Sequence, residues 1–314
     1  MKNKKTKVHF AEAMPATPFQ TGRMPNLAAM LADRGVDMVA APDEADVIVA
    51  RVLSALAGHY DLNRQYYLWT HEPNLCVIDQ PSFFDISTGR TIHVSTAFNG
   101  DVYIGPLYYF PYKALDAEEM KTLCREKSKS CAILATYRAK FDRYLNNTNV
   151  DLTEYRQRLA MDLHFNHDGF SDIYGRGWPE PVKVVEESRG AGWQEKKHGI
   201  IADYRFNLAL ENTLAKNYVT EKLWQAISAA CVPIVFAEGS GMTEVVRSTS
   251  YVDAGKFKTS ADLHEFLAGV SDAARMDYVM SAYEDYSALM RNGKKADVIA
   301  QVIDRFCDRV RAMV

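Results

Sequence analysis

One segment in the second half of the chain combines carboxylate, amide, phenol and ammonium groups. It reads YRFNLALENTLAKNYVTEK and runs from Tyr204 to Lys222. An apolar run that suits a β-strand leads into a polar loop, and Thr220-Glu221-Lys222 then opens a stretch that favours a helix. The amides and the dipole of a helix N-terminus attract anions, and a lysine in the first turn adds a mobile positive charge. The segment therefore predicts a pocket for a phosphorylated ligand with hydroxyl groups, such as a sugar nucleotide.

The end of this segment also has an ordinary structural interpretation. Thr220 suits a helix N-cap, Glu221 suits the positive end of the helix dipole, and Lys222 suits a solvated surface. Taken alone, these three residues fit both interpretations.

The elements that must position these groups alternate between strands and helices, which predicts an α/β fold with parallel sheets. Strands are expected at residues 7–12, 36–41, 46–52, 66–72, 91–97, 129–137, 205–211 and 232–239. Helices are expected at residues 24–34, 151–163, 220–230, 260–268, 272–291 and 296–314. The polar, charged stretch at 113–129 has helical propensity and is expected to link two domains.

Composition restricts the class of protein. The chain has 314 residues, 47% apolar content and a net charge of −3, which favours a globular protein and gives no argument for a nucleic-acid partner. No apolar run approaches the roughly 20 residues of a membrane span, and the basic N-terminus has no apolar segment typical of a signal peptide. The five cysteines include no C-x-x-C pair, which favours a reducing compartment. We therefore expect a cytoplasmic protein without a transmembrane segment.

The strings YRFNLALENT and YVTEKLW together resemble a family signature. In the fucosyltransferases of glycosyltransferase family 10 the pattern is typically Y-K-F-x-L-x-F-E-N-S, a short spacer and Y-x-T-E-K. Here Leu210 replaces the usual aromatic residue and Thr213 the usual serine. The resemblance extends over about 129–290 and is faint over 1–120. It implies a GT-B fold, in which two Rossmann-like domains face a central cleft.

The resemblance also implies a reaction and a role for each of the two domains. L-Fucose would move from GDP-β-L-fucose to a saccharide hydroxyl with inversion, giving an α1,3 or α1,4 bond to a GlcNAc-type residue. Residues 1–122 would bind the acceptor and residues 123–314 the donor, with the last helix allowed to pack back on the first domain. The acceptor would be an oligosaccharide or a glycolipid such as lipopolysaccharide. A bacterial, cytoplasmic enzyme with peripheral contact at the inner membrane fits this expectation.

Several donor contacts are implied in the same way. Asn212 and Tyr218 would hold fucose or phosphate, and Glu221 would hydrogen-bond the ribose or the sugar. Glu211 follows a predicted strand, where α/β sheets place ligands, and its charge would stabilise an oxocarbenium-like transition state. Asn212 and Tyr218 also fit plain loop roles, an Asx-turn and a packed aromatic ring.

Arg176 is a second candidate for binding phosphate, because it lies between two glycines in Tyr174-Gly175-Arg176-Gly177. The glycines permit a sharp turn, and a guanidinium binds phosphate through paired hydrogen bonds. The family has a comparable Gly-x-Arg element at the donor pyrophosphate, whereas an incidental surface arginine is the alternative. The sequence has no Asp-x-Asp, the element with which metal-dependent GT-A transferases hold a cation under the diphosphate. We therefore expect Arg176, Lys222 and helix amides to stabilise the leaving group, with no metal or cofactor required.

An inverting transfer also needs a base that takes the acceptor proton. Glu72, in Trp69-Thr70-His71-Glu72-Pro73, follows a predicted strand, and the family carries a glutamate in a similar place. His71 is a rival base, and a role for Glu72 in capping a turn is a third interpretation. Three further functions remain open: a GT-B transferase for another nucleotide sugar, a non-catalytic nucleotide- or glycan-binding module, and an interaction protein.

Overall fold

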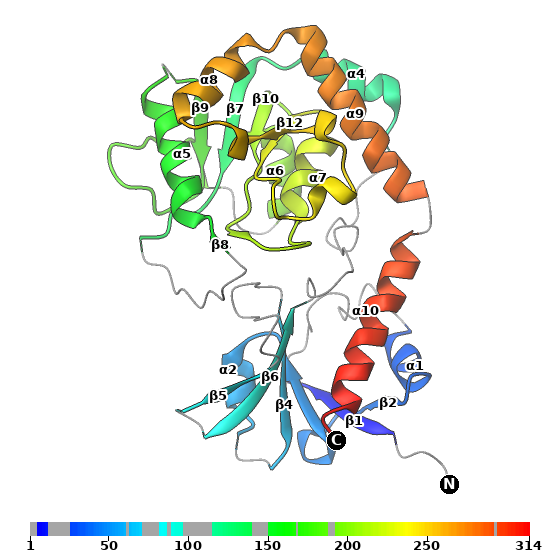
Figure 1. The fold of residues 1–314 in the computed structure, drawn as a ribbon. Coiled ribbons are helices and arrows are strands. Elements are labelled where there is room, and N and C mark those ends of the chain that lie inside the picture. Colours follow the sequence, from blue (N-terminus) through cyan, green and yellow to red (C-terminus); the bar gives the residue numbers. More distant parts are fainter. Residues whose placement is uncertain are drawn as a thin grey trace. The chain divides into compact units, whose positions relative to one another are not determined.

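The computed structural model describes two compact units in this chain (Figure 1). The first unit consists of Met1–Leu107, Tyr144–Asn149 and Gly293–Val314, and the second of Tyr108–Arg143 and Val150–Asn292. The residues outside the description are 1–4, 12–25, 61–62, 71–81, 87–88, 97–114, 140–149, 168, 188–191 and 292–293. None of the helices that are described is long and apolar enough to cross a bilayer.

The described part of the first unit contains a six-stranded sheet in the order β2-β1-β3-β4-β6-β5. Its strands are β1 (Thr6–Phe10), β2 (Val36–Met38), β3 (Val47–Ala50), β4 (Gln65–Thr70), β5 (Ser82–Asp85) and β6 (Arg90–Thr96). All neighbouring pairs are parallel except β5 with β6. Central strands such as β3 are buried along their whole length, which explains their continuous apolar runs.

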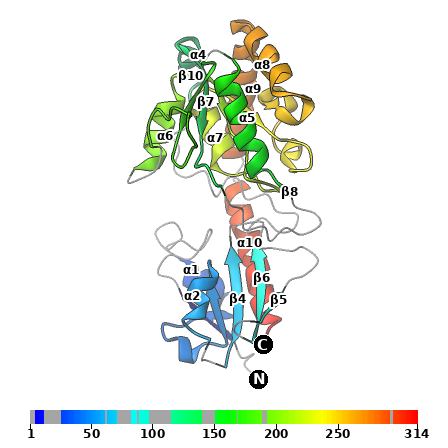
Figure 2. The ribbon, with the colours of Figure 1, turned by 90° about the vertical axis from the view of Figure 1, so that its left-hand side faces the viewer.

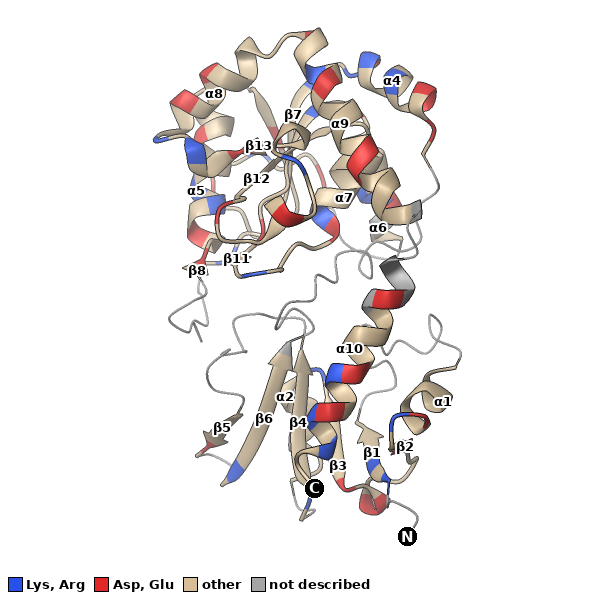
Figure 3. Ribbon diagram, turned by 45° about the vertical axis from the view of Figure 1, so that its right-hand side comes forward, with Lys and Arg blue, Asp and Glu red and all other residues tan. Residues whose placement is uncertain are grey.

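Helices α1 (Leu27–Ala32), α2 (Leu53–Ala57) and α10 (Lys294–Arg311) belong to this unit. Helix α10 is amphipathic, and Figure 3 shows acidic and basic residues along it. Its Phe306 is fully buried, with its ring centroid 5.7 Å from that of Tyr67 and 5.6 Å from that of Trp69. The last helix therefore groups with the first unit, the arrangement that the sequence analysis allowed for it.

The second unit has a five-stranded, all-parallel sheet in its described residues, in the order β13-β12-β10-β7-β9. The strands are β7 (Lys129–Leu134), β9 (Ser171–Tyr174), β10 (Tyr204–Leu208), β12 (Val232–Val235) and β13 (Val252–Asp253). The chain passes from β7 outward to β9 and then returns to β10 on the other side of β7. In such doubly wound sheets, ligands bind at the carboxyl ends of the strands where the order reverses. The fold thus predicts a ligand site at the loops after β7 and β10.

Helices cover both faces of this sheet: α4 (Ala117–Arg125), α5 (Thr153–Phe165), α6 (Trp193–Ile201), α7 (Glu221–Ser228), α8 (Ser260–Gly269) and α9 (Asp272–Arg291). Figure 2 shows α6 on one side and α5, α8 and α9 on the other. The stretch that was expected to be a linker contains α4, which packs against α9 and is held by a hydrogen bond from Arg275 to the carbonyl oxygen of Cys124. Helix α6 was not predicted, because it contains Gly199 and has no clear apolar stripe.

Candidate functional site

The loop that follows β10 approaches the end of β12 before it enters α7. The backbone N–H of Ala209 donates to the carbonyl oxygen of Ile234 at 2.9 Å, and that of Asn217 donates to Ser240 at 2.7 Å. Two of its residues form β11 (Thr213–Leu214), which pairs with β8 (Val150–Asp151) just before α5. The loop is therefore held by three parts of the unit at the ligand-binding edge of the sheet.

The carboxylate of Glu211 connects this loop with the start of α7. Its Oε1 atom accepts hydrogen bonds from the backbone N–H of Thr220 at 2.8 Å and from the Thr220 hydroxyl at 2.7 Å. Its Oε2 atom accepts from Lys222 Nζ at 2.6 Å. Lys222 Nζ also donates to Thr220 Oγ1 at 2.8 Å. These three residues, called the Glu211 cluster below, join the end of the sheet with the beginning of the helix.

The geometry disagrees with the ordinary interpretation of Thr220 and Lys222. Thr220 occupies the N-cap position of α7, but its side chain makes no cap hydrogen bond within the described structure. Its hydroxyl instead donates to Glu211 and accepts from Lys222. The Lys222 side chain is only 24% exposed, so it is not a solvated surface lysine. The first turn of α7 therefore combines the positive end of the helix dipole with an ammonium group.

A second carboxylate, that of Glu221, lies beside the same ammonium. Its Oε1 atom is 3.9 Å from Lys222 Nζ, and the side chain is 19% exposed. Burial alone would raise the pKa of Glu221, but Lys222 and Lys197 hold this pKa below its ordinary value. Burial alone would lower the pKa of Lys222, but Glu211 and Glu221 hold it above its ordinary value. The site is thus a charge network rather than an isolated cation.

Two cations of this network were missed by the sequence analysis. Arg156 on α5 is 9% exposed, and its charge interacts with Glu211 and Tyr218. Lys197 on α6 is also buried, and its charge interacts with Glu221. The sequence held a signal for Arg156, because it is three residues before Leu159 and so lies near the apolar side of a predicted helix. Lys197 could not be found, since its helix was not predicted.

The Gly-Arg-Gly turn lies at the carboxyl end of β9. At Gly175 φ is 122°, and a Cβ atom there would be 2.1 Å from the carbonyl oxygen of Ala135 in the loop after β7. No L-residue with a side chain fits this close approach, so glycine is required. The carbonyl oxygen of Arg176 accepts a hydrogen bond from the backbone N–H of Tyr137 at 2.9 Å. The exposed Arg176 thus lies at the same edge of the sheet as the Glu211 cluster, next to the loop after β7.

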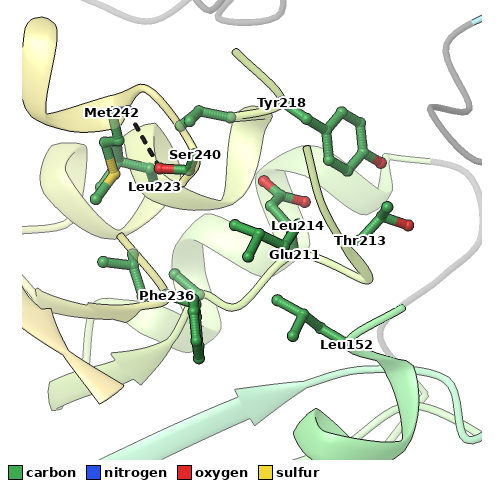
Figure 4. A pocket seen from close by; sticks show the side chains of 12 residues that line it. Leu152, Glu211, Thr213, Leu214, Tyr218, Leu223, Phe236, Ser240 and Met242 are labelled. Atoms are coloured by element: carbon green, nitrogen blue, oxygen red, sulfur yellow. Dashed lines mark hydrogen bonds between the residues drawn. The ribbon is translucent and has the colours of Figure 1, made fainter. Parts of the chain in front are cut away.

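Asn212 and Tyr218 are both held in place by the loop. The Asn212 carbonyl oxygen accepts from the backbone N–H of Leu152 at 2.8 Å, and its buried Oδ1 atom has no hydrogen-bond partner among the described residues. Tyr218 is buried and lines a small pocket with Glu211 and Leu223. In the view of Figure 4, the Glu211 carboxylate lies between the side chains of Tyr218 and Leu223. A buried polar atom without a partner is unusual in a folded protein, which makes Asn212 a candidate for a ligand contact.

The structure brings together five of the eight predicted site residues: Glu211, Tyr218, Thr220, Glu221 and Lys222. Asn212 is adjacent in the chain, and Arg176 is on a neighbouring loop without a described contact to the cluster. Glu72 and His71 lie outside the described residues, so the base stays a prediction. The part of the chain that is described contains no group of three or more His, Cys, Asp or Glu side chains suited to a metal ion. Independence from metals likewise stays a prediction.

The fold and the site together define a doubly wound α/β protein with a charged candidate ligand site at the switch point of its second sheet. Comparison with known proteins makes this more specific. The family model described as "Glycosyltransferase family 10 (fucosyltransferase) C-term" matches residues 146–313, which is more than half of the chain. The chain belongs to glycosyltransferase family 10, as its signature predicted.

Individual relatives agree with this assignment. The chain is 35% identical to an α-(1,4)-fucosyltransferase of Arabidopsis thaliana over 113 residues, 36% of this chain and 26% of the relative. It is 29% identical to an α-(1,3)-fucosyltransferase of Bos taurus over 155 residues, 49% of this chain and 38% of the relative. The chain thus matches well under half the length of either relative.

A solved structure supports the fold over nearly the whole chain. A crystal structure of an α1,3-fucosyltransferase matches with a TM-score of 0.53 at 15% identity, covering 97% of this chain and 92% of that one. Its counterpart with GDP-fucose matches with a TM-score of 0.51 at 14% identity, covering 95% of this chain and 90% of that one. The predicted GT-B fold class is thereby confirmed.

Proposed function

We propose that this protein is an inverting fucosyltransferase that transfers L-fucose from GDP-β-L-fucose to a hydroxyl of a saccharide. The observation that carries the proposal is the Glu211 cluster, in which an ammonium lies in the first turn of a helix at the switch point of a parallel sheet. Family membership supports fucose as the transferred sugar. An α1,3 or α1,4 bond to a GlcNAc-type residue of an oligosaccharide or glycolipid is the proposed product.

In the proposed reaction, the bond between the anomeric carbon of fucose and the diphosphate oxygen breaks. The acceptor oxygen attacks from the opposite face, and its proton passes to Glu72. Arg176, Lys222 and the first amides of α7 stabilise the charge that develops on the departing GDP. Because these donors are cations and amides of the protein, the proposal needs no metal ion.

The remaining carboxylates and polar groups orient the donor. Glu221 lies in the first turn of α7 and suits the hydroxyl groups of the ribose. Asn212, with its unpartnered amide oxygen, and Tyr218 suit the hydroxyl groups of fucose. Glu211 lines the same small pocket as Tyr218, and its charge is proposed to stabilise positive charge at the anomeric carbon.

Isothermal titration with GDP and with UDP tests the donor. We expect GDP to bind and UDP to give no measurable heat. Binding of UDP instead of GDP would indicate the same fold with a different nucleotide sugar. If GDP binds but GDP-fucose is neither hydrolysed nor consumed with any glycan of an acceptor array, the protein is a binding module and the proposed activity is wrong.

The base is tested by comparing Glu72→Gln with His71→Gln. We expect Glu72→Gln to keep the affinity for GDP and to lose transfer, because the amide cannot accept the acceptor proton. His71→Gln should keep both. Turnover of Glu72→Gln within a few-fold of wild type would transfer the role of base to His71 or another residue.

A further inference from the structure

Where the structure places it, Lys222 has its charge paired with carboxylates of the protein. Its ammonium donates to Glu211 at 2.6 Å and to Thr220 at 2.8 Å, and it is 3.9 Å from Glu221. Two of the three N–H groups of this ammonium are used here, so a lysine that turns fully towards a diphosphate gives up its contact with Glu211. The Glu211 side chain is 13% exposed, and a carboxylate that is nearly buried is costly without a cation. If Lys222 is to leave Glu211, another cation must compensate the negative charge of the Glu211 carboxylate.

Arg156 is placed to compensate it. Its guanidinium is more than nine-tenths buried beside Glu211, and its Nη1 atom donates to the carbonyl oxygen of Leu210, the residue before Glu211, at 3.2 Å. Its Nε atom is buried and has no hydrogen-bond partner in the part of the chain that the structure describes. A buried arginine that lacks its own carboxylate and keeps a free N–H is unusual, because both deficits are costly. A carboxylate released by Lys222 would supply the missing countercharge.

We propose that Arg156 is a positioning residue that compensates the charge of Glu211 when Lys222 turns from Glu211 to the diphosphate of the donor. This inference rests on the proposed function only for the presence of a diphosphate. Thr220 keeps its two hydrogen bonds to Glu211 throughout, so the carboxylate stays in place while its cation changes. Arg156 therefore acts through Glu211 and Lys222 and makes no contact with the donor.

The first test replaces Arg156 with methionine, which keeps the length of the side chain and removes its charge. Lys222 is then the main cation near Glu211, and Glu211 holds it more tightly. The affinity for GDP should therefore fall about tenfold, which is within the usual range of coupling between neighbouring charges. Arg156→Lys keeps the charge and should remain within about threefold of wild type. Arg158→Met, at an exposed arginine on the same helix, is the matched control and should bind like wild type.

The decisive test adds Glu211→Gln to the Arg156→Met variant. Glutamine can still accept the hydrogen bond from the backbone of Thr220, but it no longer holds an ammonium by charge. Lys222 is released, and affinity for GDP should return to within about threefold of wild type. If Arg156 bound phosphate directly, or only supported the fold, Glu211→Gln would not restore binding, and the inference would be overturned.

Two further measurements keep the inference testable. If Arg156→Met does not fold, Glu211→Gln alone should tighten diphosphate binding several-fold, and weaker binding would overturn the proposal.

The same series of variants is measured with UDP and with inorganic pyrophosphate. If UDP replaces GDP, the proposed donor fails while the role of Arg156 is still tested with UDP. If none of the three binds to the wild-type protein, the proposed function and this inference both fail.

Discussion

A lysine lies at each end of helix α7, the buried Lys127 and the partly buried Lys222, and the two have opposite kinds of partner. At the amino edge of the sheet, Lys127 donates to the carbonyl oxygens of Ala202 and Ala229, which are the C-caps of α6 and α7. At the carboxyl edge, Lys222 lies in the first turn of α7 and pairs with Glu211. The first lysine compensates the negative ends of two helix dipoles, whereas the second occupies the positive end of one.

The difference lies in what can replace each partner. The partners of Lys127 are neutral backbone carbonyls that belong to the fold, and burial lowers the pKa of this lysine. The partners of Lys222 are carboxylates, which outweigh burial and raise its pKa. A phosphate can substitute for a carboxylate, but it cannot substitute for a helix terminus. Lys127 therefore supports the fold, whereas the partners of Lys222 are of the kind that the proposed exchange with a diphosphate requires.

The largest expected effect comes from Lys127→Met. Two buried carbonyl oxygens lose their donor and two helix ends lose their cation, so the free energy of unfolding should fall by about 3 kcal/mol. Urea unfolding measures this loss, and GDP affinity of the folded protein should change less than twofold. Lys183→Met, at an exposed lysine of the same unit, should leave both unchanged. If Lys127→Met lost little stability but changed its affinity for GDP, Lys127 would belong to the ligand site, and the distinction between the two lysines would be wrong.

Sequence alone could predict one lysine of this pair but not the other. Lys222 was found because it stands in a recognisable signature, and the hydrophobic pattern gave the strands and helices around it, including α9 at its observed bounds. Lys127 is preceded and followed by polar residues and reads as part of a linker. Its burial depends on helix ends 75 and 102 residues away, which no local pattern encodes. Arg156 gave a local signal by its place near the apolar side of a helix, but its proximity to Glu211 appears only when α5 packs against the loop after β10.

A smaller effect is expected from Lys222→Ala. The variant should bind GDP more weakly by about 1–3 kcal/mol, the scale of a charge-assisted hydrogen bond. Stability should fall less than in Lys127→Met, because Glu211 keeps its hydrogen bonds from Thr220 and its attraction to the neighbouring charge of Arg156. Isothermal titration gives the affinity, with Lys216→Ala, at an exposed lysine of the same loop, as the control. An unchanged dissociation constant would remove Lys222 from the site.

The smallest effect, and the most specific to the comparison, is a difference in the alkaline pH dependence of stability. The pKa of Lys127 in the folded protein lies below its ordinary value of 10.5, so the unfolded chain binds more protons and stability rises with pH up to that value. The pKa of Lys222 lies above 10.5, so its contribution is complete below that value and is lost as pH rises further.

Urea unfolding of wild type, Lys127→Met and Lys222→Met from neutral to alkaline pH separates these two signs. At each pH, the free energy of unfolding of the variant is subtracted from that of the wild type. This difference cancels the titration of all other groups that the substitution leaves unaffected. The difference between wild type and Lys127→Met should widen as pH approaches 10.5, whereas that between wild type and Lys222→Met should stay constant and narrow only above this value. Parallel curves for the two variants would mean that both ammonium groups experience the same surroundings, and the distinction between a lysine of the fold and a lysine of the site would be lost.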